Sequence, residues 1–321
     1  MQEAYSRSTM ITYRLLNPAE MPAAVSLWVS VFGVEAEFFQ TLLDGGDPDD
    51  FSVGAFEHGR QVSSVHVFIR WFRDRNGNPH KVGGIGSVST LPEARAHGHS
   101  SKLLKMAIAE MENRGCVWSY LGTGVNDHYA RHGWRTLSTP FFRGSLRDDL
   151  KGLQLEKSSV DEELLSRMAA IYQSYSSTRS MANARSKSLW MHSMRYRTTR
   201  SHHSVYTSMD GETTTAYLVC GVSDGCLDLI EGACLPDRDG DLGELISSCL
   251  ALAAAEGIQT ARYHLPEDSG VYNAFEEACT EVWSGEERSW MGRPIAGRIS
   301  WPDLAALHAD PRGRRSELDH F

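Results

Sequence analysis

The segment from Val88 to Leu104 most constrains the fold of this chain, because it predicts a strand that runs through a short polar turn into a helix. The turn contains Arg95, Gly98 and Ser100 in the spacing R-x-x-G-x-S. At the N-terminus of a helix the first backbone N–H groups lack intrahelical acceptors, and the helix dipole adds partial positive charge. We therefore predict that a phosphate-bearing ligand binds at this turn.

The order of predicted elements in the first half recurs in the second half. Residues 81–91 and 226–235 are each predicted as a strand that leads through Leu-Pro and a loop into a helix with an apolar stripe. Each helix stops at a glycine, Gly115 or Gly257, before another strand and a short helix. This order predicts an internal duplication of a mixed α+β unit rather than a regular alternation of strands and helices.

The length of 321 residues is compatible with two domains of about 150 residues each. We predict a first unit over residues 1–150, a polar helical linker over 151–203, and a second unit over 204–300. Residues 301–321 are predicted to be a charged, loosely ordered tail.

Composition narrows the classes of partner. The net charge of -9 argues against nucleic-acid binding. The N-terminus has no apolar signal-peptide core, and no run approaches the ~20 apolar residues of a membrane span, so we expect a cytoplasmic protein without a membrane partner. The six cysteines form no C-x-x-C pair and are expected to be free thiols. His97 and His99 lack a third nearby ligand, so no metal site is expected.

Residues 82–134 resemble the GCN5-related N-acetyltransferase (GNAT) superfamily. That family has a strand, a Q/R-x-x-G-x-G/A turn and a helix, and then a tyrosine followed by glycine-aromatic after the next strand. Here the second motif is Tyr129-Ala-Arg-His-Gly133-Trp134. Ser100 departs from the last Gly or Ala of the turn, but serine is also small. The resemblance implies that residues 1–150 are the catalytic, CoA-binding unit.

The repeat and the helices between its halves resemble the tandem acetyltransferases of the enhanced-intracellular-survival type. This resemblance implies two tandem acyl-CoA N-acyltransferase folds, each a mixed, mostly antiparallel sheet flanked by helices. Those proteins usually carry a third, sterol-carrier-like domain and place the chain terminus near the active site. We expect neither feature here, because the sequence ends before such a domain.

The resemblance implies acetyl-CoA, or another short acyl-CoA, as the cofactor. The turn would bind the pyrophosphate through backbone N–H groups, and the end of the strand would pair with the pantetheine arm as an added strand does. The expected cofactor-binding residues are Val88, Ser89, Thr90, Arg95, Ala96, His97, Gly98, His99, Ser100, Ser101 and Asn126.

Acyl transfer needs a proton donor for the leaving thiolate and a base for the amine. Tyr129 matches the family position of the donor. Glu35 is the candidate base, with Glu37, Asp127 and His128 as alternatives, and each is compatible with an ordinary surface position. The aromatic residues expected to line the acceptor pocket, or alternatively to pack in the core, are Trp28, Phe32 and Phe38.

The corresponding turn of the second unit, residues 237–244, contains three aspartates and a glutamate. These charges would repel phosphates, so we predict that the second unit does not bind CoA and instead walls the acceptor cleft. We expect direct acetyl transfer, within a ternary complex, to a primary amine of a small molecule such as an amino sugar, an aminoglycoside-like compound or an amino-acid derivative. The alternatives are a protein lysine or N-terminal acetyltransferase and a non-catalytic CoA-binding protein. Homo-oligomer formation stays open.

Overall fold

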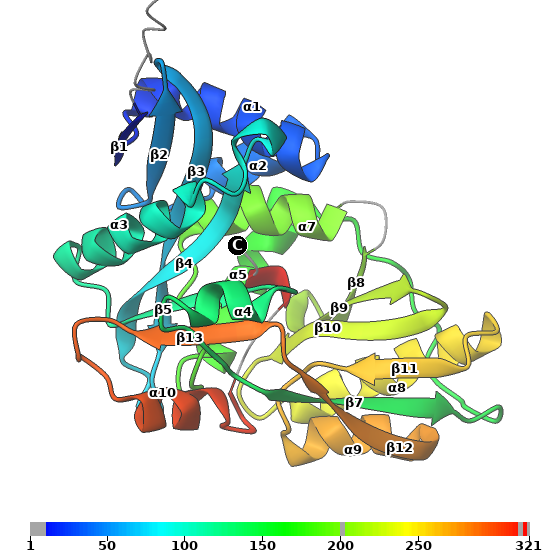
Figure 1. Ribbon diagram of the computed structural model, residues 1–321. Coiled ribbons are helices and arrows are strands. Elements are labelled where there is room, and N and C mark those ends of the chain that lie inside the picture. Colours follow the sequence, from blue (N-terminus) through cyan, green and yellow to red (C-terminus); the bar gives the residue numbers. More distant parts are fainter. Residues whose placement is uncertain (1–10, 200–202, 314–316, 320–321) are drawn as a thin grey trace, which may run out of the picture.

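The computed structural model describes residues 11–199, 203–313 and 317–319, and these ranges contain two β-sheets with helices on their faces (Figure 1). The strands of the first sheet are β1 (Ile11–Leu15), β2 (Phe51–Glu57), β3 (Arg60–Arg73), β4 (Pro79–Thr90), β5 (Trp118–Gly122), β6 (Arg135–Thr136) and β13 (Trp290–Pro294). Their order is β1-β2-β3-β4-β5-β13-β6. The β4–β5 pair is parallel, and the other neighbours are antiparallel.

The second sheet has the order β12-β7-β11-β10-β9-β8. Only the β10–β11 pair in it is parallel. Its strands are β7 (Thr139–Leu146), β8 (His203–Asp210), β9 (Thr213–Ser223), β10 (Cys226–Cys234), β11 (Thr260–Tyr263) and β12 (Cys279–Glu287). Both sheets are therefore mixed and mostly antiparallel, which confirms the predicted α+β fold class.

Helices cover both faces of the first sheet. The helix α3 (His99–Asn113) buries an apolar stripe against β2, β3 and β4, because its apolar residues recur at helical spacing. The helix α1 (Met21–Phe32), followed by α2 (Ala36–Asp44), packs on the opposite face of β3. Alternate side chains of β3 therefore meet α3 and α1 in turn.

The second sheet is layered in the same way. On one face lie α8 (Asp239–Ala255) and α9 (Ser269–Glu277). On the other face lie α5 (Glu162–Tyr175) and a helical run made of α6 (Lys187–Leu189), η3 (Trp190–Met194) and α7 (Arg195–Thr199). The helices predicted as a linker over 151–203 are thus part of the core of the second sheet, because their apolar residues face it.

The predicted repeat is present in the element order. The series β3-β4-α3-β5 is matched by β9-β10-α8-β11, with antiparallel and then parallel pairing in both. In each unit the helix is followed by a glycine with positive φ, Gly115 at 81° and Gly257 at 85°. These left-handed positions end the helices as the sequence indicated.

The two units exchange strands, which the sequence did not predict. Residues 135–146 lie within the predicted first unit, but their strand breaks after β6 and the chain continues as β7 in the second sheet. In return, β13 lies between β5 and β6 in the first sheet, and Figure 1 shows β13 beside β5. The predicted boundary at residue 150 therefore does not divide the two sheets.

The predicted tail is also different in the structure. Residues Trp301–His308 form α10, whose first turn is capped by the Ser300 hydroxyl and whose Leu304 is fully buried. The short helix η4 (Glu317–Asp319) buries Leu318 in the core of the second sheet. The expectation of a loosely ordered 301–321 is thus wrong for these two segments, because both have apolar anchors. Within the described ranges, no helix is both long and apolar enough to cross a membrane.

Candidate functional site

The strands β4 and β5 separate beside the predicted turn. They pair at three positions, the last of which is Gly84 opposite Tyr120, while β4 continues to Thr90. A bulge with Ser87 in the left-handed region at φ 49° bends β4 beyond this point. One edge of β4 is therefore unpaired by β5 from residue 85 onward, which is where an extended ligand can add as a strand.

The predicted strand contacts do not all face this gap. Leu91 donates its N–H to the Val62 carbonyl on β3, so Ser89, two residues earlier, also faces β3. The Ser89 carbonyl accepts the Ser63 hydroxyl at 2.7 Å. Thr90 faces the gap, and its carbonyl lies 3.3 Å from the Arg95 Nε donor. Val88 lies in the bulge itself.

The turn before α3 presents a row of free backbone donors. The N–H groups of residues 96–101 make no hydrogen bond to any described residue. Ala96 has φ 65° and Gly98 has φ 76°, and these two left-handed positions turn the backbone so that we describe residues 96–101 as a nest of N–H groups. Together with the dipole of a 15-residue helix, the nest forms an anion site.

The side chains around the nest are mostly cationic or neutral. Arg95, His97 and Lys102 are exposed beside it. The His99 ring is buried, and its Nδ1 lies 2.9 Å from the hydroxyl of Tyr13. Burial, helped by His97, lowers the pKa of His99, so its ring is neutral at neutral pH. The ring of His99 is thus taken up by its contact with Tyr13, and its backbone N–H is one of the free donors of the nest.

Ser101 lies in the first turn of α3 and does not cap it. Gly98 occupies the cap position, and the Ser101 hydroxyl lies 3.2 Å from Nε2 of His132. This contact joins the start of α3 to the end of α4 (Asn126–Ala130), the short helix that carries Tyr129. The two predicted motifs are thus brought together in space.

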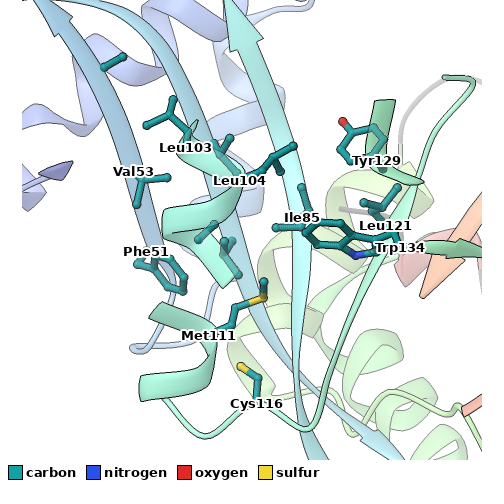
Figure 2. Close-up of a cluster of buried hydrophobic side chains, with 14 of the residues drawn as sticks. Phe51, Val53, Ile85, Leu103, Leu104, Met111, Cys116, Leu121, Tyr129 and Trp134 are labelled. Carbon is teal, nitrogen blue, oxygen red and sulfur yellow. The ribbon is translucent and has the colours of Figure 1, made fainter. Parts of the chain in front are cut away.

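Tyr129 is nearly buried, with 9% of its surface exposed. Its ring packs edge-on against Trp134, and Figure 2 shows its hydroxyl pointing away from Trp134. The hydroxyl has no hydrogen-bond partner among the described residues. Burial raises the pKa of Tyr129, so the phenol stays protonated at neutral pH. A buried, protonated hydroxyl without a partner is suited to donate a proton to a ligand.

Asn126 holds α4 in place. Its side-chain amide donates to the Thr136 hydroxyl at 2.8 Å and to the Arg288 carbonyl at 2.9 Å. Its Nδ2 hydrogens are thereby used within the protein, and only the Oδ1 atom is left for the predicted contact with a cofactor.

The predicted acceptor residues fall into different environments. Trp28 is fully buried, and its Nε1 donates to the Ser64 hydroxyl at 2.8 Å, so the core-packing alternative applies to it. Phe32 is 45% exposed at the end of α1. Phe38 packs against Tyr196 of α7, 6.0 Å between ring centroids. Glu35 is exposed immediately before α2.

In the second unit, acidic side chains lie at the turn that corresponds to the nest of α3. Asp239 and Asp241 lie in the first turn of α8. The Asp239 carboxylate accepts from the Cys234 thiol, and Arg238 lies 3.7 Å from Asp241 and forms an ion pair with Asp210. Carboxylates thus occupy the end of α8 that corresponds to the nest of α3. No group of three or more metal-ligating side chains is found in the described ranges.

Sequence reasoning missed the contribution of β13. Arg293 on this strand donates to the carbonyl of His132, three residues after Tyr129, at 2.9 Å. Nothing in the local sequence of a five-residue strand indicates which sheet it joins, so this contact had no sequence signal.

The first unit matches the model of a known family. Residues 12–137 match the model of the acetyltransferase (GNAT) domain. They include β1 to β6, the nest and Tyr129. This stretch is therefore a GNAT acetyltransferase domain, an enzyme domain of the acyltransferase class. A comparison with curated protein sequences gives no significant match.

Solved structures extend the likeness to both sheets. A conserved protein of Enterococcus faecalis, of unknown function and named as a probable N-acyltransferase, has a TM-score of 0.66 at 16% identity, over 89% of this chain and 73% of its own. Eis1 from Mycobacterium abscessus has a TM-score of 0.63 at 15% identity, over 89% and 74%. A GCN5-related N-acetyltransferase from Anabaena variabilis has 0.64 at 14%, over 89% and 73%. At these identities the likeness establishes the fold and not the substrate.

Proposed function

We propose that this protein transfers an acetyl group from acetyl-CoA to a primary amine of a small molecule. The observation that carries the proposal is the row of free N–H groups over residues 96–101, which follows the unpaired edge of β4 and is joined to the Tyr129 segment by the contact between Ser101 and His132. This arrangement suits a diphosphate joined to an extended amide arm that ends at a thioester. CoA thioesters have this layout, and they are available in the cytoplasm, where we place the reaction.

The residues present fit such a ligand. The N–H groups of the nest would bind the pyrophosphate, with Arg95 and Lys102 adding positive charge at the rim. The free edge of β4 around Val88 and Thr90 would pair with the amide groups of the arm. The second unit would not bind a second molecule, because Asp239 and Asp241 repel phosphates at its turn.

In the transfer step the amine nitrogen forms a bond to the acetyl carbon, and the carbon–sulfur bond of the thioester breaks. Tyr129 gives its proton to the departing thiolate, and a base takes the proton that the amine loses. Glu35 is our candidate base, from the exposed start of α2. Because the amine attacks the thioester directly, the protein forms no covalent intermediate.

The acceptor would enter from the α1–α2 side, past Phe32 and Phe38. Phe38 contacts Tyr196 of α7, so helices of the second unit stand beside this entrance. The second unit would in this way wall the acceptor cleft.

The test is release of free CoA thiol from acetyl-CoA in the presence of single amines. Glucosamine, kanamycin and tyramine represent the three acceptor classes, and a lysine-containing peptide represents a protein acceptor. We expect release with at least one small amine, and mass spectrometry of its product should show one added acetyl group. Release with the peptide alone would favour a protein acetyltransferase. Binding of acetyl-CoA without release by any amine would show a non-catalytic binding protein.

A further inference from the structure

The segment that carries Tyr129 is attached to the far end of the chain. The chain leaves β5 at Gly122, passes through α4 and returns as β6, but β5 and β6 do not pair with each other. The strand β13 lies between them and pairs with both. In Figure 1, α4 lies beside β13. In the described part of the chain, the strands before and after α4 are therefore joined to each other only through β13, residues 290–294.

Backbone and side-chain hydrogen bonds fasten both ends of the α4 segment to residues around β13. On the entry side, Thr123 donates to the Ser289 carbonyl at 2.8 Å. The Asn126 amide donates to the Arg288 carbonyl on the same side. On the exit side, Leu137 donates to the Trp290 carbonyl at 2.8 Å.

Arg293 is the side chain of β13 that reaches the turn directly after Tyr129. Its Nε donates to the His132 carbonyl at 2.9 Å, and its guanidinium carbon lies 5.7 Å from the centre of the Trp134 ring. Gly133, with φ 89°, leaves room for this approach, since a Cβ there would lie 3.1 Å from Nε of Arg293. Arg293 also donates a hydrogen bond to the Pro294 carbonyl of its own strand, at 3.2 Å.

Trp134 contacts both Arg293 and Tyr129. The two rings meet edge-on at 81°, with centroids 6.2 Å apart. The Trp134 indole N–H also donates to the Ser119 hydroxyl on β5, which in turn donates to the Gly83 carbonyl on β4. The ring is thereby fixed to the two strands that separate at the site.

We propose that Arg293 is a positioning residue for Tyr129: by holding the His132 carbonyl and the Trp134 ring, it sets the place of the Tyr129 hydroxyl beside the gap between β4 and β5. The proposal rests on the proposed function, in which Tyr129 is the proton donor. It assigns the second half of the chain a part in catalysis, through β13, although that half lacks a phosphate site of its own.

The test is a double-mutant cycle on kcat, measured with acetyl-CoA and the best amine of the panel. Arg293→Met keeps the apolar stem and removes the donor. We expect kcat to fall about tenfold, with KM for acetyl-CoA changed by less than about twofold, because a displaced catalytic group slows transfer without weakening binding. In the Tyr129→Phe background the same substitution should change kcat by less than about twofold.

Arg298→Met is the matched control. Arg298 follows on the same segment and reaches the carbonyls of Cys116 and Glu112, away from α4, so its replacement should leave kcat unchanged. Hydrogen exchange over residues 126–134 should increase in Arg293→Met and not in Arg298→Met. Arg293→Lys, which keeps the charge, gives the same comparison with a smaller loss of kcat if Arg293→Met does not fold.

The outcomes distinguish an error in the role of Tyr129 from an error in the role of Arg293. If Tyr129→Phe retains full kcat, the proposed role of Tyr129 is wrong and Arg293 has no donor to position. If Tyr129→Phe is impaired but Arg293→Met lowers kcat equally in both backgrounds, or Arg298→Met lowers it as much, Tyr129 keeps its role and the assignment of Arg293 is overturned.

Discussion

Tyr129 combines three properties at the level of a single residue. It is nearly buried, its pKa is raised by burial, and its hydroxyl has no partner among the described residues. A phenol that is left unpaired in a nearly buried position has a cost in stability, which is expected at a site where the hydroxyl is needed by a ligand.

Tyr129→Phe should lower kcat about 100-fold, because the departing thiolate loses its proton donor. KM for acetyl-CoA should change by less than about twofold, since the nest is unaltered. Steady-state measurement of thiol release gives both constants. Tyr206→Phe is a matched control, because Tyr206 is similarly buried but lies in the second sheet.

An unchanged kcat in Tyr129→Phe would contradict the assignment. The pH dependence of activity in the wild-type protein is a second test of the role of Tyr129. The acceptor amine loses its proton as pH rises, while the raised pKa of Tyr129 keeps its proton above the ordinary value of about 10. Activity should therefore increase from neutral pH into the alkaline range without an early decline.

Ser100 offers a test in which stability and binding move in opposite directions. An aspartate at the start of α3 interacts favourably with the helix dipole, so Ser100→Asp should be neutral or slightly stabilising for the fold. The same charge would repel the pyrophosphate, and we expect acetyl-CoA to bind at least about tenfold more weakly. Calorimetric titration and thermal unfolding measure the two effects.

Ser166→Asp is the control, since Ser166 is exposed on α5 in the second unit. It should leave binding unchanged. Equal affinity in Ser100→Asp and the wild-type protein would show that phosphate does not bind at this turn.

The hairpin between β3 and β4 is the element that delivers β4 to the site. Asp74 closes it, because its Oδ1 accepts the N–H groups of Asn76 and Asn78 at 2.8 and 2.9 Å. Its Oδ2 lies 3.0 Å from Nε2 of His80. Burial alone would raise the pKa of Asp74, but the hydrogen bonds from His80 and Asn78 outweigh it and lower the pKa to about 2.

Asp74→Asn should therefore lower the free energy of unfolding by about 2 kcal/mol at pH 7. A carboxylate whose folded pKa lies below its unfolded value stabilises the fold above the unfolded pKa. This contribution is lost as pH falls toward the folded value, so the gap between the two proteins should narrow by about 1 kcal/mol from pH 5 to pH 3. Urea unfolding at several pH values measures it.

Asp148→Asn, at an exposed residue outside any described ion pair, should show no such gap. A difference between Asp74→Asn and the wild-type protein that stays constant from pH 7 to pH 3 would contradict the ionic role of Asp74.

The elements that depend on local sequence could be predicted. The strand, nest and helix of residues 79–113 follow from a polar turn before an apolar stripe, and Tyr129 follows from its spacing to the glycine-aromatic pair. The sequence could not decide whether Trp28 lines a pocket or packs in the core, because both roles need an apolar residue at this position on α1. Its partner Ser64 lies 36 residues away along the chain.

At the scale of the whole molecule, the assignment of strands to the two sheets depends on pairing between strands that are distant along the chain. Neither β7 nor β13 carries a local signal for the sheet it joins, and the units therefore looked separate when they share strands. The helices of residues 162–199 looked like a linker because only their contacts show which sheet they cover. The contact of Arg293 with the Tyr129 turn is a consequence of the same exchange.

The central claim is that one half of this two-unit chain binds an acyl-CoA at the nest of α3 and the other half does not. Calorimetric titration of the full chain with acetyl-CoA tests it most directly. We predict one molecule bound per chain, and binding at least about tenfold weaker in Ser100→Asp. Two molecules per chain, or no binding at all, would contradict the account.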